Sequence, residues 1–205
     1  MLSKIALSAV ILAGGDSKRM GTNKAFLTFN RVYLIDYIFE QLHRLFIEVL
    51  IVTDREKEFK HLNAKIVSDM INSGEKNALR GIHSGLFHAS NEAAFFVACD
   101  MPFLSESLIY EMSKYAADHD AVLPRVDGYY QPLFAFYNRR VLNMITRSLE
   151  QKCFKVTDLY SGLNIKEVNK EMITTHDPDM RSFFNVNTRD DYEKAKKIYA
   201  TRTGI

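Results

Sequence analysis

The chain is poor in the residues that interrupt helices and strands or cross-link a fold. Its 205 residues include no tryptophan, two cysteines, four prolines and nine glycines. Cys99 lies in the apolar run FFVACD, which predicts a buried small hydrophobe, and no Cys-x-x-Cys or histidine spacing predicts a zinc site. There is no Pro-, Gly- or Ser-rich linker and no internal repeat. We therefore expect a reduced, cytoplasmic protein that folds without disulfides or structural metals.

An excess of charge of either sign is also missing. Lysine and arginine total 27, aspartate and glutamate total 25, and the net charge is +2. This balance argues against a general nucleic-acid or membrane surface, so any anion site has to be local. The first residues, MLSKIALSAVILAGG, look like a short signal peptide. They also form a good buried strand, and cleavage near Ala13 would cut into the loop motif described below, so we expect a strand.

Strand and helix patterns alternate along the chain. Short apolar runs predict buried strands, whereas apolar residues three or four apart predict helices. Ser105 is a candidate N-cap, and Thr188 with Asp191 forms a candidate capping pair. Residues 151–180 give no clear pattern. The expected strands are 6–12, 49–52, 64–67, 93–98, 120–124 and 131–137, and the expected helices are 34–45, 78–90, a segment after Ser105, and 190–200.

This alternation predicts an α/β fold. We expect one domain over residues 1–205, with a Rossmann-like, mainly parallel sheet and helices on both of its faces. Ligands bind beyond the carboxyl ends of the strands in such sheets. Gly14-Gly15 follows the first strand, Asp69 the third and Asp100 the strand over 93–98, so these residues are expected to converge on one ligand.

The most informative segment is LAGGDSKRMGTNK, residues 12–24. Adjacent glycines let the backbone turn and present its N–H groups to an anion, and Arg19 and Lys24 add positive charge. The generic phosphate motifs G-x-G-x-x-G and G-x-x-x-x-G-K-[ST] are absent, since Thr22 follows Gly21. The segment predicts a nucleoside triphosphate site; the plainer alternative is a glycine turn with two solvated cations.

Asp100 is the second candidate. It lies where an apolar strand gives way to a loop, and Pro102 stiffens the exit. A carboxylate in this position suits Mg²⁺, which prefers oxygen ligands and usually keeps substrate phosphates in its shell. Alone, Asp100 could equally be a turn residue; together with the glycine loop it predicts a metal ligand.

Four segments together resemble a known family. LAGG followed by RMG and K, then ACDMPFLS, QPLFAFY and FFNVNTRDDYEKA, are similar to segments of nucleotidyltransferases that join an NTP to a phosphorylated acceptor, most of all the molybdenum cofactor guanylyltransferases. The resemblance implies a nucleotidyltransferase fold, magnesium on Asp100, and an acceptor site near Asn185 and Asn187. The GTP-binding residues that it implies are Leu12, Ala13, Gly14, Gly15, Lys24, Asp69 and Asp100.

The family's reaction follows from the same resemblance. It implies that GMP passes from GTP to the terminal phosphate of molybdopterin with release of pyrophosphate, and that Arg19, Lys24 and Asp100 are catalytic. The nucleophile is already an anion, so positioning and relief of charge repulsion are what the protein has to supply. Substrates would be GTP and molybdopterin, with transient contacts to molybdoenzymes or their chaperones.

One segment departs from the family pattern. A GPLAG-type turn is usual before the helix over 78–90, but this chain reads NALRG from Asn77 to Gly81, which adds Arg80. The base preference therefore stays open, as does the oligomeric state. The alternatives are a CTP-dependent molybdopterin cytidylyltransferase, another NTP:phosphate nucleotidyltransferase, or a non-catalytic adaptor that binds the cofactor.

Overall fold

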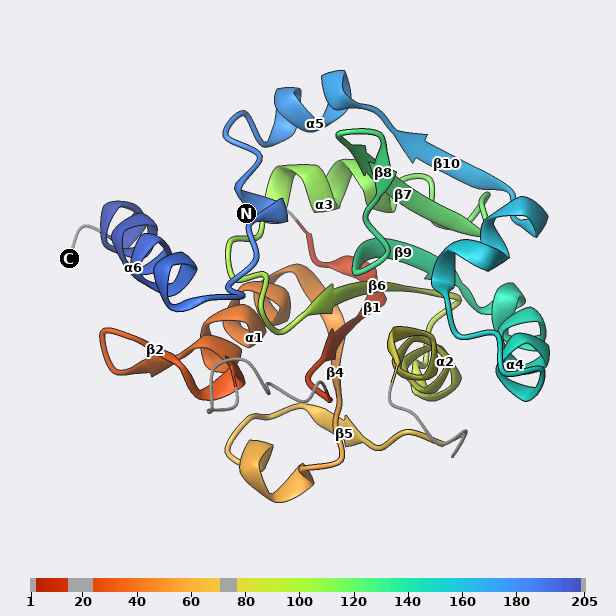
Figure 1. The fold of residues 1–205 in the computed structure, drawn as a ribbon, viewed down its shortest axis with the longest axis horizontal. Coiled ribbons are helices and arrows are strands. Elements are labelled where there is room, and N and C mark those ends of the chain that lie inside the picture. The colour runs from red at the N-terminus through yellow and green to blue at the C-terminus, as the bar shows by residue number, and fades with distance from the viewer. Residues whose placement is uncertain (1–2, 15–23, 71–76, 204–205) are drawn as a thin grey trace.

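An eight-stranded sheet organises the protein (Figure 1). The structure is a computed structural model, and it describes residues 3–14, 24–70 and 77–203. The strands follow the order β10-β7-β9-β6-β1-β4-β5, with β8 paired to β7. Four adjacent strands, β6, β1, β4 and β5, run parallel to one another. β7 and β10 are also paired in parallel, whereas β9 runs antiparallel to both β6 and β7. The prediction of a mainly parallel sheet is confirmed, and the exceptions are β9 and the short β8, which pairs antiparallel with β7.

The strands have the following bounds. Those of the main sheet are β1 Ile5–Leu12, β4 Phe46–Val52, β5 Lys65–Val67, β6 Ala93–Ala98, β7 Ala121–Val126, β8 Tyr129–Tyr130, β9 Phe134–Asn138 and β10 Ile165–Val168. A separate two-stranded ribbon pairs β2 (Thr28–Phe29) with β3 (Val32–Tyr33). Every strand expected from the sequence is present within a few residues of its predicted bounds.

Helices cover both faces of the sheet, as predicted (Figure 1). The α-helices are α1 Leu34–Leu45, α2 Ala78–His88, α3 Glu106–Ser113, α4 Leu142–Glu150, α5 Lys170–His176 and α6 Arg189–Thr203, and short 3₁₀ helices include η1 Lys24–Phe26, η2 Glu56–Phe59 and η4 Val156–Gly162. Ser105 accepts a hydrogen bond from the Leu108 N–H and so caps α3. The unassigned stretch 151–180 contains η4, β10 and α5. None of the helices in the described ranges is long and apolar enough to cross a membrane.

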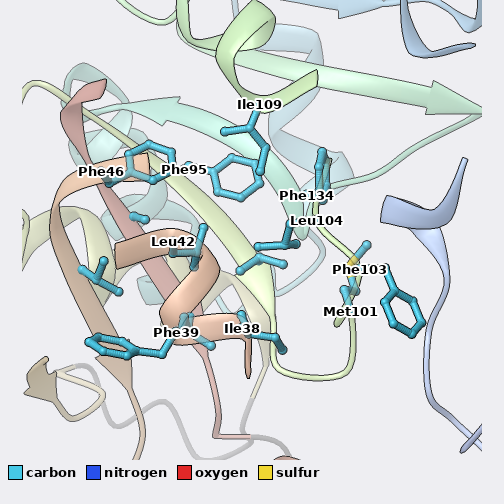
Figure 2. Packing of buried hydrophobic residues seen from close by; sticks show 14 of the residues in the cluster. Ile38, Phe39, Leu42, Phe46, Phe95, Met101, Phe103, Leu104, Ile109 and Phe134 are labelled. Carbon is cyan, nitrogen blue, oxygen red and sulfur yellow. The ribbon is translucent and has the colours of Figure 1, made fainter. Parts of the chain in front are cut away.

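Alternation along β1 divides the interior into two cores. Ala9 and Ile11 face a cluster that includes α1 and α3, whereas Val10 faces a second cluster that includes α2 and α4. Figure 2 shows part of the first cluster, where side chains of α1 pack toward Phe95 of β6. β1 is thus buried on both faces, as expected for a parallel strand in the middle of a doubly covered sheet.

Two glycines let α2 lie unusually close to β1 and β6. A Cβ atom on Gly85 would lie 2.6 Å from the Phe96 ring and 2.8 Å from Val10 Cγ1, and one on Gly81 would lie 2.9 Å from Leu12 Cδ2. A larger residue at position 85 would meet an aromatic ring and a β-branched side chain and would push the helix away from the sheet, whereas at position 81 it would displace the end of the Leu12 side chain. The first turn of α2 is therefore held directly above the carboxyl end of β1.

Gly85→Ala tests this close approach. Overpacking a core costs about 1–3 kcal/mol, whereas replacing glycine by alanine in a helix gains only about 1 kcal/mol. We expect the variant to lose up to about 2 kcal/mol in the free energy of unfolding, measured by urea denaturation. Gly162→Ala is the control, because its nearest neighbour is the flexible end of Met144 at 3.3 Å. A Gly85→Ala variant that is more stable than the unmodified protein would contradict the packing argument.

Candidate active site

The carboxyl ends of four adjacent strands form the floor of the site. The Ala13 N–H donates to the Val52 carbonyl at 2.9 Å, and the Thr53 N–H donates to the Val67 carbonyl at 2.9 Å. The Cys99 N–H donates to the Leu12 carbonyl at 3.1 Å. These bonds continue the parallel ladders past the ends of the strands. The segments that leave β1, β4, β5 and β6 are thereby fixed side by side at one edge of the sheet, where ligands bind in open α/β folds.

Lys24 joins three distant segments above this floor. Its Nζ donates to Asp100 Oδ2 at 3.0 Å and to Asn187 Oδ1 at 2.7 Å. The side chains of Lys24 and Asp100 are 14% and 21% exposed, so the ion pair is shielded but reachable. Lys24 begins η1, directly after the glycine loop, and Asp100 follows β6. The structure therefore brings together three residues that the sequence proposed for one site.

Apolar anchors and a buried amide hold the Asp100 loop in place. Met101, Phe103 and Leu104 are all buried in the core beneath it. Gln41, on α1 and 4% exposed, donates from Nε2 to the Pro102 carbonyl at 2.9 Å and accepts from the Leu104 N–H at 3.3 Å through Oε1. The loop is clamped on both sides of residue 103, which restricts where Asp100 can lie.

The segment after η5 (Arg181–Phe183) reaches the site through the backbone. The Val186 N–H donates to the Asp100 carbonyl at 2.8 Å, so residue 187 lies next to the loop that carries Asp100. Asp191, at the start of α6, accepts from the Asn187 and Thr188 N–H groups, and the Asp191 N–H donates to Thr188 Oγ1. This is the capping pair predicted from the sequence, and it orients the residue that contacts Lys24.

Asp69 lies at the other side of the site, after β5. Arg80 Nη2 lies 3.5 Å from Asp69 Oδ2, and the two side chains are only 8% and 14% exposed. Arg80 belongs to the first turn of α2, which Asn77 caps by accepting the Arg80 N–H at 3.0 Å. The sequence singled out Arg80 only as an addition to the usual turn; its ion pair with Asp69 is a structural finding.

The remaining residues that the sequence predicted for the site have different positions and contacts in the structure. Leu12 is the last residue of β1, Ala13 and Gly14 follow it at the edge of the sheet, and a Cβ on Gly14 would meet open space. Asn185 makes a different contact, since its Nδ2 donates to the Phe183 carbonyl at 3.0 Å. Gly15 and Arg19 lie outside the described residues.

Two further residues support the site without a sequence signal for that role. Gln41 lies on the apolar face of α1, so the sequence indicates a buried polar side chain at this position but not the groups that it contacts. Thr53 Oγ1 donates to the Ala13 carbonyl at 3.2 Å and accepts the Arg55 N–H at 3.2 Å, so it links the turns after β1 and β4.

The site can hold a divalent cation of the hard, oxygen-seeking kind. No group of three or more His, Cys, Asp or Glu side chains forms a complete metal cage within the described parts of the chain. Mg²⁺ needs no such cage, since it typically takes one or two carboxylates and fills the rest of its shell with water and substrate phosphates. Asp100 fits that donor set. Burial raises the pKa of the neighbouring Cys99 thiol to about 12, and the Asp100 carboxylate adds to the rise.

Paired charges give the site its chemical character. In the free protein the Lys24 ammonium and the Asp100 carboxylate neutralise each other at 3.0 Å. A phosphate ligand together with a cation offers each of them a new partner of opposite charge. The arrangement suits an anion that arrives with a metal ion, which is how nucleoside triphosphates are usually bound.

Comparison with known proteins points the same way. The family description "MobA-like NTP transferase domain" matches residues 9–162. The "probable molybdenum cofactor guanylyltransferase" of Natranaerobius thermophilus is 38% identical over 195 residues, 93% of this chain and 95% of the relative. The "molybdenum cofactor guanylyltransferase" of Desulfosudis oleivorans is 34% identical over 193 residues, 93% and 95% of the two chains. Among solved structures, molybdopterin-guanine dinucleotide biosynthesis protein A of Archaeoglobus fulgidus superposes with a TM-score of 0.84 at 26% identity, covering 95% of this chain and 99% of that one.

Gln41→Leu tests the clamp on the Asp100 loop. The substitution preserves bulk but leaves the buried Pro102 carbonyl and Leu104 N–H without their side-chain partner. We expect a loss of about 1–3 kcal/mol in the free energy of unfolding, measured by urea denaturation. Glu40→Gln, at an exposed position of the same helix, serves as the control and should change stability little. Equal stabilities of the Gln41→Leu variant and the unmodified protein would show that the clamp is dispensable.

Proposed function

The chain belongs to the MobA-like NTP transferase family, and on this premise we propose that it transfers GMP from GTP to the terminal phosphate of molybdopterin. The family is one of nucleotidyltransferase enzymes, and the likeness extends over nearly the whole chain. The observation that carries the proposal is the contact of Lys24 with Asp100 and Asn187, because it joins a phosphate-seeking cation, a metal-seeking carboxylate and a segment expected near the acceptor.

The proposed reaction is an in-line displacement at phosphorus. A terminal phosphate oxygen of the acceptor attacks the α-phosphorus of GTP and forms a new P–O–P linkage. The bond between the α-phosphorus and the oxygen bridging to the β-phosphate breaks, and the electron pair leaves with pyrophosphate. Since the nucleophile is already ionised, the protein needs no strong base; it has to align the two phosphates and offset their repulsion.

Each part of the site has a role in this proposal. Backbone groups of Leu12, Ala13 and Gly14, with Gly15, cradle the nucleotide, and the Lys24 ammonium binds phosphate oxygens. Arg19 is proposed to stabilise the departing pyrophosphate together with Lys24. Asp69 and Asp100 are the remaining residues proposed to contact GTP.

Asp100 is the residue that would hold Mg²⁺. When bound, the ion supplies positive charge to phosphate oxygens and so lowers the cost of bringing two anions together. The remaining work falls to the chain itself: Gln41 fixes the loop that carries Asp100, and Lys24 keeps the carboxylate neutralised until the ligands arrive.

The acceptor site is proposed next to the same residues. Asn187 shares Lys24 with Asp100, which supports a role for its side chain beside the reacting phosphates, and Asn185 lies two residues earlier in the same segment. We further propose that residues 1–205 act as one nucleotidyltransferase domain, since one sheet contains strands from Ile5 to Val168. Transient contact with molybdoenzymes or their chaperones, which would receive the product, is part of the same proposal.

Pyrophosphate release tests the function directly. The purified protein is mixed with Mg²⁺, molybdopterin on an acceptor protein, and GTP, CTP, UTP or ATP in turn. We expect release with GTP, and the dinucleotide product identified by mass spectrometry. Release with CTP alone would show a cytidylyltransferase, and binding of GTP without release by folded protein would show an adaptor; either result would overturn the proposal.

Asp100→Asn tests the metal role. The amide keeps the shape of the side chain but removes the charge that attracts a cation. Loss of one such electrostatic group typically costs about 10²–10³ in rate, so we expect turnover to fall by that factor at ordinary Mg²⁺ concentration. Asp118→Asn, in the exposed loop before β7, is the matched control and should retain full activity. Unchanged turnover of Asp100→Asn at every Mg²⁺ concentration would remove Asp100 from the metal site.

A further inference from the structure

We propose that Tyr192, on the first turn of α6, is a positioning residue that holds Asn187 against Lys24. The inference rests on the proposed function, in which the Lys24 ammonium binds phosphate oxygens. It goes further by assigning a role to a residue that lies outside the contact of Lys24 with Asp100 and Asn187. The Tyr192 hydroxyl acts on the phosphate site through Asn187 and Lys24 rather than by touching a ligand.

Two hydrogen bonds join the same pair of distant segments. Lys24 Nζ donates to Asn187 Oδ1 at 2.7 Å, and the Tyr192 hydroxyl donates to the Thr28 carbonyl at 2.5 Å. Thr28 lies four residues after Lys24, at the start of β2, and Tyr192 lies five residues after Asn187. The first turn of α6 is therefore attached to the β2–β3 ribbon (Figure 1). A single contact would let the two segments pivot, whereas two contacts fix their relative position.

An aromatic cluster brings the same three segments together a second time. Phe29, the residue after Thr28, is fully buried. Its ring lies 6.2 Å from that of Tyr192 at an interplanar angle of 14°, and 6.0 Å from that of Phe103 at 6°. These are distances at which offset aromatic rings attract each other. Phe103 belongs to the loop after Asp100, so the segments that meet at the Lys24 ammonium also meet at the Phe29 ring.

α6 packs on the rest of the protein through a narrow stripe. Tyr192, Ala195 and Tyr199 follow one another at intervals of three and four residues and belong to the first core cluster, whereas most other residues of the helix are charged. Tyr192 is the member of this stripe nearest to Asn187. Its contacts therefore decide how the first turn of the helix lies, and with it the segment that carries Asn187.

The ring and the hydroxyl of Tyr192 contribute differently. Aromatic rings attract each other over centroid separations of about 4.5–7 Å, so stacking on Phe29 tolerates sliding. A hydrogen bond weakens steeply as its length and angle change, and the one from Tyr192 to the Thr28 carbonyl is short. The ring thus attaches α6 to the protein, and the hydroxyl fixes where the helix begins relative to Lys24.

Tyr192→Phe tests the hydroxyl without removing the ring. The variant retains the stacking on Phe29 and loses the donor to the Thr28 carbonyl. A hydrogen bond of ordinary net strength corresponds to about a threefold to tenfold change in an equilibrium constant. Since Asn187 is then no longer held against Lys24, we expect the Kd for tripolyphosphate, measured by calorimetry without metal, to rise by about that factor. An unchanged Kd in a variant shown by circular dichroism to be folded would overturn the inference.

Tyr130→Phe is the matched control. Tyr130 is also half-buried, and its hydroxyl donates to Glu167 Oε2 at 2.9 Å, between β8 and β10. The variant loses one tyrosine hydrogen bond, as Tyr192→Phe does, but at a different place on the sheet. A merely structural role of Tyr192 predicts that both variants unfold at lower urea concentration and that neither changes the Kd. We expect only Tyr192→Phe to change the Kd, and an equal rise in Tyr130→Phe would contradict the inference.

A double variant shows whether the effect passes through Asn187. In an Asn187→Ala background the side chain that Tyr192 positions is absent, so Tyr192→Phe should cause no further change in the Kd for tripolyphosphate. The same change in both backgrounds would mean that Tyr192 does not act through Asn187, and the inference would be wrong.

The outcomes separate this inference from the proposed function. If Tyr192→Phe weakens tripolyphosphate binding through Asn187 but no nucleotide supports pyrophosphate release, the proposed function fails and the role of Tyr192 stands. If GTP supports release but Tyr192→Phe binds tripolyphosphate as the unmodified protein does, the function stands and the role of Tyr192 is wrong. If the unmodified protein does not bind tripolyphosphate, both are wrong.

Discussion

The contact of Lys24 with Asp100 and Asn187 is the constraint on which the active site depends. The three residues come from segments 76 and 163 positions apart along the chain, counted from Lys24. On its own, Lys24 would simply bind an anion, and Asp100 would attract a cation of any kind. Because they are held together and partly shielded from water, the ammonium and the carboxylate neutralise each other in the free protein. A phosphate ligand that arrives with a cation then gives each of them a new partner of opposite charge.

Much of the surrounding structure serves to keep these groups in register. Gln41 clamps the loop after Asp100, the Val186 N–H binds the Asp100 carbonyl, and Asp191 caps the helix that follows Asn187. On the other side, the glycines of α2 allow its first turn to reach the end of β1 and carry Arg80 to Asp69. The two sides of the site are thereby supported by separate elements.

The fold could be predicted from local patterns because the central parallel strands are buried on both faces and their sequences are mostly apolar. The Ser105 cap and the Thr188–Asp191 pair were predictable for a similar reason, since each involves residues three apart. The antiparallel direction of β9 was not, because strand direction depends on which partners a strand finds. The contacts of Gln41 with residues 102 and 104 were equally hidden, since only the fold brings them together.

The candidate site was predictable to the extent that its residues follow strands. The position of Asp69 and Asp100 at the edge of the sheet was predicted correctly, because the carboxyl ends of adjacent parallel strands lie at the same edge. The pairing of Lys24 with Asn187, rather than with Asn185, depends on which way two side chains of one segment point, and no periodicity in an irregular loop encodes that. The partner of Arg80 was hidden as well, because nothing in NALRG indicates that α2 lies against the end of β5.

The central claim is that Lys24 and Asp100 hold each other's place in the free protein, and it is tested most directly by titrating Lys24→Met with each ligand separately. Mn²⁺ binding without nucleotide is followed by electron paramagnetic resonance, and tripolyphosphate binding without metal by calorimetry. The account predicts that the variant binds Mn²⁺ more tightly than the unmodified protein, because a competing ammonium is gone, and binds tripolyphosphate more weakly. Lys196→Met, on α6, should change neither affinity. A Lys24→Met variant that binds both ligands as the unmodified protein does, or that loses affinity for Mn²⁺, would contradict the account.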